Sequence, residues 1–261
     1  VMAQALPLRQ GGLQVVSLMH SGLTPCLCLA IFVPVPSQPD YFWEESRHGK
    51  IKMTPADRHK YWERNYADPR SEKGKDWYGT WDDFKQDIQG PPFRKTDPVL
   101  VVGCGNSRIP ADLVGRENLL SVTAMDYSKT VIAMMRKKYP DDIEWVHADA
   151  RNMPVFADRS FGIVIEKATI DGEGAFNEHF QILTEISRVL RPGGRFICIS
   201  LGQPAELETE LFFKNASYGW RVQSKLSYDD YYVYTMTKHA KPQKHAKKLK
   251  APSVGHSPEE L

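Results

Sequence analysis

The stretch Pro98-Val-Leu-Val-Val-Gly-Cys-Gly-Asn-Ser107 decides the fold class. Its apolar start is typical of a strand that is buried on both faces, as in a parallel sheet, and the strand runs directly into a glycine loop. Glycines remove the Cβ atoms that would keep a ligand away from the backbone, and N–H groups at the start of the following helix can donate to that ligand. We expect this helix to contain Ile109 and Leu113.

Four more apolar strands follow this loop and alternate with helices. The strands are expected at Ser121–Met125, Ile143–His147, Phe161–Ile165 and Arg195–Ser200. Ser128 can cap the first intervening helix, and apolar residues at helical spacing predict another helix over 176–190, ended by Pro192-Gly193-Gly194. This alternation is typical of a doubly wound α/β fold.

The C-terminal part of the pattern is different. A helix is expected near 205–216, followed by two strands, Gly219–Leu226 and Tyr231–Met236, which a short polar turn joins into a hairpin. The sequence therefore predicts an α/β fold with a mostly parallel seven-stranded sheet and a C-terminal antiparallel hairpin.

Charge divides the 261 residues into three parts, although the whole chain carries a net charge of only +2. Residues 53–237 hold 24 Lys and Arg against 27 Asp and Glu, a net charge of −3, and the segment 238–250 holds six Lys and no acid. We therefore expect a folded domain at 53–237, a disordered N-terminal extension at 1–52 and a disordered Lys-rich tail at 238–261. Met53 is a candidate start of the domain, ahead of a helix capped by Thr54 with Pro55 in its first turn.

Several classes of protein are excluded or disfavoured by composition. The four cysteines form no C-x-x-C pair, so we expect reduced thiols, no metal site and a cytoplasmic location. The longest weakly polar run, 23–36, is only 14 residues long and contains three prolines, so we expect no membrane span. The small net charge argues against a specific nucleic-acid partner.

Carboxylates at the ends of successive strands indicate a nucleoside-containing ligand. Asp126 ends the second strand, where it can accept hydrogen bonds from two ribose hydroxyls, and Asp149 follows the third strand, where it can accept one from an adenine amino group. The G-x-G-x-x-G pattern of dinucleotide sites is broken because Arg108 stands at its third glycine position. A cationic sulfonium cofactor also gains from acidic surroundings, but spacing alone leaves both cofactor classes open.

Several motifs of this chain resemble the class I S-adenosylmethionine-dependent methyltransferases. More narrowly, they are similar to the methyltransferase-like group that includes the elongation factor 1-alpha lysine methyltransferases, and the resemblance covers roughly 55–238. It is carried by Leu100–Ser107, Met125–Ser128, Ile165–Lys167, Arg188–Phe196 and two more specific marks, Tyr61–Tyr66 and Asp76–Gly79. The resemblance implies a Rossmann-like fold, S-adenosylmethionine as cofactor and a lid built from 53–97.

Matched residue by residue, the resemblance implies nine cofactor-binding positions. These are Trp62, Tyr66, Trp77, Gly103, Asp126, Tyr127, Asp149, Ala150 and Lys167. Aromatic faces attract a methylsulfonium and exclude water, in keeping with a lid, although packing of this segment onto the sheet would also use aromatics. Lys167 is expected either to contact the cofactor carboxylate or to form a surface salt bridge.

The function implied is that of a methyltransferase, with protein-lysine N-methylation of elongation factor 1-alpha favoured. The alternatives are a small-molecule methyltransferase and a non-catalytic module that binds the cofactor. Glu166 and Asp171 are candidates to orient an incoming ammonium, and no general base is assigned. The family pattern has glycine where this chain has Ala168, in a loop expected to admit the acceptor. No Asn/Asp-Pro-Pro-Tyr/Phe motif follows the fourth strand, which disfavours amide and adenine acceptors.

Overall fold

The structure is a computed structural model that describes residues 8–10, 13–16, 31–34, 43–46, 49–70, 76–139, 142–172, 176–204, 207, 218–226 and 231–239. The chain divides into two compact units, Val1–Tyr41 and Phe42–Leu261. The first unit contains a three-stranded antiparallel sheet of β1 (Leu8–Gln10), β2 (Leu13–Val16) and β3 (Ile31–Pro34). The predicted boundary at 52/53 and the predicted disorder of both ends stay predictions.

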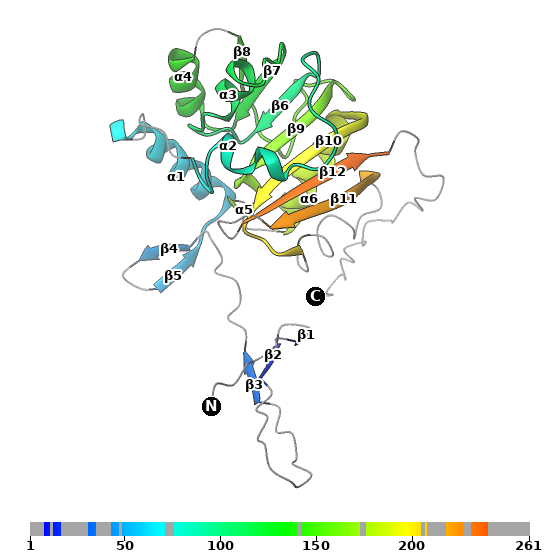
Figure 1. The fold of residues 1–261 in the computed structure, drawn as a ribbon. Coiled ribbons are helices and arrows are strands. Elements are labelled where there is room, and N and C mark those ends of the chain that lie inside the picture. Colours follow the sequence, from blue (N-terminus) through cyan, green and yellow to red (C-terminus); the bar gives the residue numbers. More distant parts are fainter. Residues whose placement is uncertain are drawn as a thin grey trace, which may run out of the picture. The chain divides into compact units, whose positions relative to one another are not determined.

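The second unit is built on a seven-stranded sheet with the order β11-β12-β10-β9-β6-β7-β8 (Figure 1). Its strands are β6 (Val99–Val102), β7 (Val122–Asp126), β8 (Ile143–His147), β9 (Phe161–Lys167), β10 (Leu190–Ser200), β11 (Trp220–Leu226) and β12 (Tyr232–Lys238). Strands β6 to β10 pair in parallel, and β12 pairs antiparallel with both β10 and β11. The predicted mostly parallel sheet with a C-terminal antiparallel hairpin is confirmed.

Helices and a short hairpin complete this unit. They are α1 (Pro55–Ala67), α2 (Trp81–Phe84), a 3-10 turn at Lys85–Asp87, α3 (Ile109–Gly115), α4 (Lys129–Lys138), α5 (Thr169–Gly172), α6 (Phe176–Val189) and the hairpin of β4 (Trp43–Ser46) with β5 (Gly49–Lys52). Thr54 and Ser128 cap α1 and α4 as predicted, because each hydroxyl accepts a backbone N–H three residues ahead. The predicted helix near 205–216 falls almost entirely outside the described residues.

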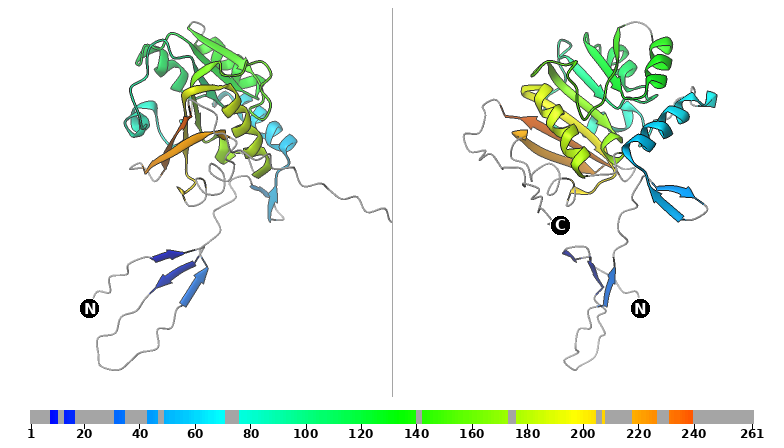
Figure 2. Two further views of the ribbon diagram at one scale, coloured as in Figure 1. Left: turned by 90° about the vertical axis from the view of Figure 1, so that its right-hand side faces the viewer. Right: turned by 180° about the vertical axis from the view of Figure 1, so that it is seen from behind.

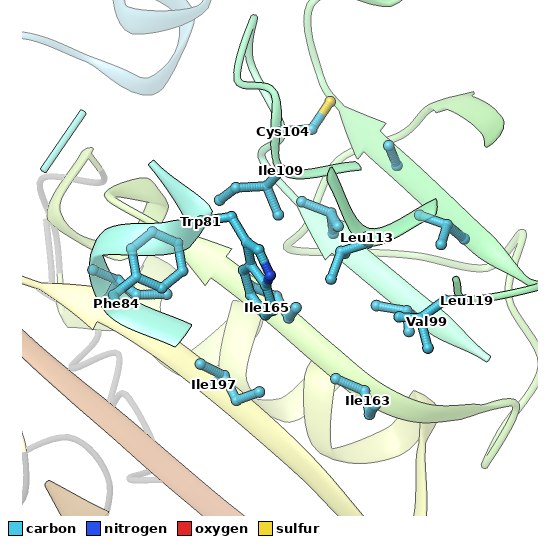
Figure 3. Close-up of a cluster of buried hydrophobic side chains, with 14 of the residues drawn as sticks. Trp81, Phe84, Val99, Cys104, Ile109, Leu113, Leu119, Ile163, Ile165 and Ile197 are labelled. Atoms are coloured by element: carbon cyan, nitrogen blue, oxygen red, sulfur yellow. The ribbon is translucent and has the colours of Figure 1, made fainter. Parts of the chain in front are cut away.

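Alternation along the central strands divides the core into two layers, because successive side chains of a strand point to opposite faces. Leu100 and Val102 of β6 pack in the cluster that includes Leu183 and Ile186 of α6. Neighbouring positions pack in the second cluster with residues of α2, α3 and α4, as Figure 3 shows for Val99, Trp81 and Leu113. The view from behind in Figure 2 shows α6 lying across its face of the sheet.

One boundary differs from the expectation. Pro192-Gly193-Gly194 was predicted to end a helix before a strand at Arg195, but α6 ends at Val189 and β10 already begins at Leu190. Leu190 is buried and pairs with Phe161, and the ladder to β9 shifts register before it resumes at Arg195. The Pro-Gly-Gly stretch is therefore a local irregularity within β10, between Leu190 and Arg195, and not the end of a helix. Helical periodicity cannot reveal such an irregularity.

Among the described residues, no helix combines the length and the apolar character that crossing a bilayer would require.

Candidate active site

The parallel strands bring the predicted site residues to one edge of the sheet. Since β6, β7, β8, β9 and β10 run in the same direction, their carboxyl ends meet there. Gly103 follows β6, Asp126 ends β7, and Asp149 lies in a turn just after β8. Lys167 ends β9, two residues later than the strand end expected from the sequence.

The glycine loop after β6 adopts a backbone that favours glycine. Gly103 and Gly105 have φ values of +58° and +49°, in the left-handed region. The N–H of Cys104, between them, donates to the carbonyl of Met125 at 2.9 Å, which fixes the loop to the end of β7. A Cβ at Gly103 would lie 2.2 Å from Oγ1 of Thr169, whose hydroxyl donates to the Val102 carbonyl.

We expect Gly103→Ala to lower the free energy of unfolding by roughly 2 kcal/mol, because it combines left-handed strain with overpacking against Thr169. Gly115→Ala is the matched control, since Gly115 ends α3 and nothing lies within 4 Å of its added Cβ. Urea unfolding of both variants measures the difference. Equal stability of the two variants would contradict the tight packing of Thr169 on this loop.

Asp126 holds the glycine loop and the start of α4 through its carboxylate. Its Oδ2 accepts the N–H of Gly105 and its Oδ1 accepts the N–H of Ser128, both at 2.9 Å. The residue is 4% exposed, and burial raises the pKa of this carboxyl to about 6 against the lowering effect of the two backbone hydrogen bonds. Each carboxylate oxygen retains lone-pair capacity for a further donor.

Three aromatic side chains of the predicted lid lie together beside this loop, and we call Trp62, Tyr66 and Trp77 the aromatic group. The Trp62 ring stacks on Tyr66 at 5.6 Å between centroids and meets Trp77 edge-on at 6.4 Å. A Cβ at Gly105 would lie 2.8 Å from the Tyr66 hydroxyl, so Tyr66 covers the loop closely. Burial, with Asp126 nearby, raises the pKa of the Tyr66 phenol well above its usual value.

Asp149 belongs to an ion-pair chain that sequence analysis did not anticipate. Arg151 donates to both carboxylate oxygens of Asp149, at 2.7 to 3.1 Å, and to Glu178 of α6 at 2.9 Å. Glu178 also pairs with Arg58 of α1, which is 2% exposed. Burial alone would raise the pKa of Asp149, but the hydrogen bonds from Arg151 outweigh burial and hold it below its usual value. This series of ion pairs connects α1 with the turn that carries Asp149.

The remaining predicted cofactor positions lie near Asp126 and Asp149. The carbonyl of Tyr127 is contacted by two imidazoles, that of His59 at 3.1 Å and that of His147 at 3.0 Å. Ala150 is partly buried and packs against the core cluster beneath α6. Both positions thus belong to the same edge as the glycine loop.

Lys167 contacts the lid segment rather than standing at the surface. Its side chain is 5% exposed, and Nζ donates to the carbonyls of Trp77 at 2.6 Å and Gly79 at 3.1 Å and to Asp76 at 3.3 Å. Lys167 does form a salt bridge, with Asp76, but the pair is largely buried. The expected position of this salt bridge at the surface is therefore wrong. Contact between Lys167 and the cofactor carboxylate stays a prediction.

Glu166 lies in the core directly before Lys167. It has no exposed surface, and its Oε2 accepts the N–H groups of Thr169 and Ile170 at 3.0 and 3.3 Å. Burial, followed by the charge of Asp171, raises the pKa of this carboxyl to about 8. At neutral pH Glu166 is thus mostly uncharged, and its complete burial separates it from an acceptor at the surface.

Asp171 lies closer to the end of β10. Its carboxylate accepts the Ser200 hydroxyl at 2.5 Å and the N–H of Leu201 at 3.2 Å, and Tyr78 of the lid segment also hydrogen-bonds to it. Burial raises the pKa of Asp171 although these hydrogen bonds oppose the rise. Glu166 and Asp171 are the two residues predicted to orient the methyl acceptor. Of these, Asp171 has hydrogen-bond partners both in the lid segment and next to the sheet.

Ala168 shows why the family pattern has glycine at its position. Its φ is +62°, in the region where a Cβ is unfavourable, and its N–H donates to Ile199 on β10 at 3.0 Å. Tyr78, on the facing lid segment, also has a φ of +62°. Strained backbone of this kind is a feature of functional sites, and here it occurs on both sides of Asp171.

Sequence reasoning missed four residues that shape this edge: Asp76, Tyr78, Arg151 and Ser200. Asp76 and Tyr78 lie within the motif Asp76–Gly79, of which only Trp77 was predicted to belong to the site. Arg151 stands two residues after Asp149, a spacing that permits a local ion pair, and Ser200 ends a predicted strand. Apart from the pair of Arg151 with Asp149, the contacts of these residues are to partners distant in sequence.

Comparisons with known proteins identify the family to which this part of the sequence is similar. Residues 100–198, from β6 to β10, match the methyltransferase domain family. The chain is 33% identical over 178 residues to EEF1A lysine methyltransferase 4 of Bos taurus, a match that spans 62% of this chain and 68% of the relative. The chain belongs to the S-adenosylmethionine-dependent methyltransferases. The resemblance inferred from the motifs is thereby confirmed.

Two further comparisons define the extent of the similarity. The methyltransferase is 34% identical over 173 residues to the eEF1A lysine and N-terminal methyltransferase of Danio rerio, covering 62% of this chain and 24% of that longer protein. A chain from the complex of the Haloferax volcanii Trm112 methyltransferase activator with a methyltransferase superposes with a TM-score of 0.55 at 17% identity, covering 68% of this chain and 97% of that one. The latter likeness concerns the fold.

Proposed function

We propose that this methyltransferase transfers a methyl group to a lysine side chain of elongation factor 1-alpha. The observation that carries the proposal is the 33% identity over 178 residues to an EEF1A lysine methyltransferase. The match to the methyltransferase domain family, over residues 100–198, includes both the glycine loop and the 166–171 loop. The longer relatives named for lysine and N-terminal methylation of the same factor support it.

The edge described above fits S-adenosylmethionine. The left-handed glycines hold the loop in a tight turn beside Asp126, which has acceptor capacity left for ribose hydroxyls. Asp149 can accept from an adenine amino group. The aromatic group would hold the methionine end and exclude water. We assign Gly103, Tyr127, Ala150 and Lys167 to the same pocket.

When bound, the cofactor supplies a methyl group on a positively charged sulfur. In-line transfer needs positioning and exclusion of water more than acid–base chemistry. A lysine acceptor reacts only as the neutral amine, and a partly buried, aromatic-lined entry lowers its pKa. We assign Asp171, which accepts the Ser200 hydroxyl, the role of orienting the acceptor. Glu166, mostly uncharged at neutral pH, would instead stabilise the loop through the N–H groups of Thr169 and Ile170.

The test uses radiolabelled S-adenosylmethionine with purified elongation factor 1-alpha and, separately, with a cell extract. We expect label on the factor, located to one lysine by mass spectrometry and lost when that lysine is replaced by arginine. Label confined to small molecules would favour the small-molecule alternative, and cofactor binding without label would favour a non-catalytic module.

A cytoplasmic location is part of the same proposal. The two cysteines within the described residues, Cys104 and Cys198, are free and buried, as expected in a reducing compartment. A fluorescent fusion that accumulates in the cytoplasm would support this location, and one retained in another compartment would contradict it.

A further inference from the structure

The segment Asp76–Gly79 is fastened to the end of β9 by one buried ammonium group. Lys167 Nζ lies within 3.3 Å of three acceptors, the carbonyls of Trp77 and Gly79 and the carboxylate of Asp76. A lysine ammonium has three N–H groups, so this four-residue segment provides an acceptor for each of them. Burial lowers the pKa of Lys167, and Asp76 opposes that lowering, so the charge is tolerated because it is paired.

A second attachment lies at the glycine loop. The Ser107 hydroxyl donates to the Asp76 carboxylate, and its oxygen accepts the N–H of Ile109 at the start of α3. The segment is thus hydrogen-bonded both to the end of β9 and to the loop that joins β6 to α3. Trp77 lies between these ties, 43% exposed, and contacts Trp62 of the aromatic group.

We propose that Lys167 is a positioning residue that holds the segment 76–79, and with it Trp77, in place within the aromatic group. The inference rests on the proposed cofactor pocket, and it gives the ammonium of Lys167 a role other than direct contact with the cofactor carboxylate. The argument is geometric: all three acceptors belong to the lid segment, two of them are backbone carbonyls, and the side chain is almost fully buried.

The first test needs no cofactor. Lys167→Met keeps the apolar stem but removes every donor, so amide hydrogen exchange over 77–83 is expected to quicken about tenfold or more, most clearly at Thr80 and Asp83, whose N–H groups are hydrogen-bonded. Lys137→Met is the matched control, because Lys137 is exposed on α4, and it should leave these amides unchanged. Unchanged exchange in Lys167→Met would overturn the proposal.

Asp76→Asn provides a second, milder variant in case Lys167→Met fails to fold. It removes the charge that Lys167 pairs with while leaving an acceptor for Ser107, so a smaller acceleration is expected. In the double variant the two effects should be less than additive, because both act on one attachment. Full additivity, or no acceleration with Asp76→Asn, would contradict the assignment.

The second test measures binding of S-adenosylhomocysteine by calorimetry, together with tryptophan fluorescence. Lys167→Met should weaken binding about tenfold and reduce the fluorescence change on binding, since Trp77 is no longer held. If the unmodified protein does not bind this ligand, the proposed cofactor pocket fails, whereas hydrogen exchange still decides the role of Lys167. If the protein binds and the variant binds equally well with the same fluorescence change, the positioning role fails alone.

Discussion

Replacing Asp126 by alanine should weaken binding of S-adenosylhomocysteine at least about a hundredfold. Two hydroxyl donors to one carboxylate contribute about 1.5–3 kcal/mol each, and the variant also frees the N–H groups of Gly105 and Ser128. Calorimetry of Asp126→Ala measures the loss. Glu144→Gln is the matched control, because Glu144 is an exposed carboxylate near the amino end of β8 and should leave affinity unchanged.

The same carboxylate makes cofactor affinity depend on pH. With a pKa of about 6, Asp126 is mostly protonated at pH 5 and mostly ionised at pH 7.5. If only the ionised form accepts both hydroxyls, affinity should fall about tenfold between pH 7.5 and pH 5. Asp126→Asn should bind weakly and without this pH dependence, and a variant that kept the wild-type profile would assign the titration to another group.

The second large effect concerns stability. Raising the pH from 5 to 8 should lower the free energy of unfolding, and Glu166→Gln should remove about 3 kcal/mol of that fall. The pKa of Glu166 rises from 4.5 to about 8 on folding, so the folded state holds this proton more tightly. Its contribution is therefore complete below about pH 4.5 and is lost as the pH rises through 8.

Glutamine is a close substitute because Glu166 is uncharged over most of this range. Its amide oxygen can still accept the N–H groups of Thr169 and Ile170. Urea unfolding at pH 5, 6.5 and 8 compares wild type, Glu166→Gln and the exposed control Glu144→Gln. Parallel pH profiles for wild type and Glu166→Gln would show that the pKa of the Glu166 carboxyl is not raised on folding. That result would contradict an uncharged Glu166 at neutral pH.

The sheet could be predicted from sequence because the signals for it are local. The first predicted strand is an apolar run closed by Gly103 and the second ends before Asp126. Ser128 and Thr54 cap helices through contacts three residues away. The hairpin was equally local, with two strands separated by a polar turn. What periodicity could not resolve was the start of β10, since Leu190 continues the apolar stripe of α6 while pairing with β9.

The site was predictable in position but not in connectivity. Spacing along the chain placed Asp126 and Asp149 at strand ends, and parallel pairing then brought them to one edge. Lys167, however, finds its partners about 90 residues earlier in the chain, and Arg58 finds Glu178 120 residues later. Such pairs depend on how α1 and the lid segment lie against the sheet, which is a tertiary property that no local pattern encodes.

The six residues from Glu166 to Asp171 have a consequence for how this protein can change. Glu166 accepts the N–H of Thr169, and Lys167 donates to the carbonyl of Trp77. Ala168 has a positive φ, Thr169 packs on the glycine loop and Asp171 accepts the Ser200 hydroxyl. Because residues with different contacts lie next to one another here, we expect a substitution at one of them to disturb the backbone that positions the others. Variants selected for a new acceptor should accumulate their first changes outside this stretch, on surfaces that carry a single task.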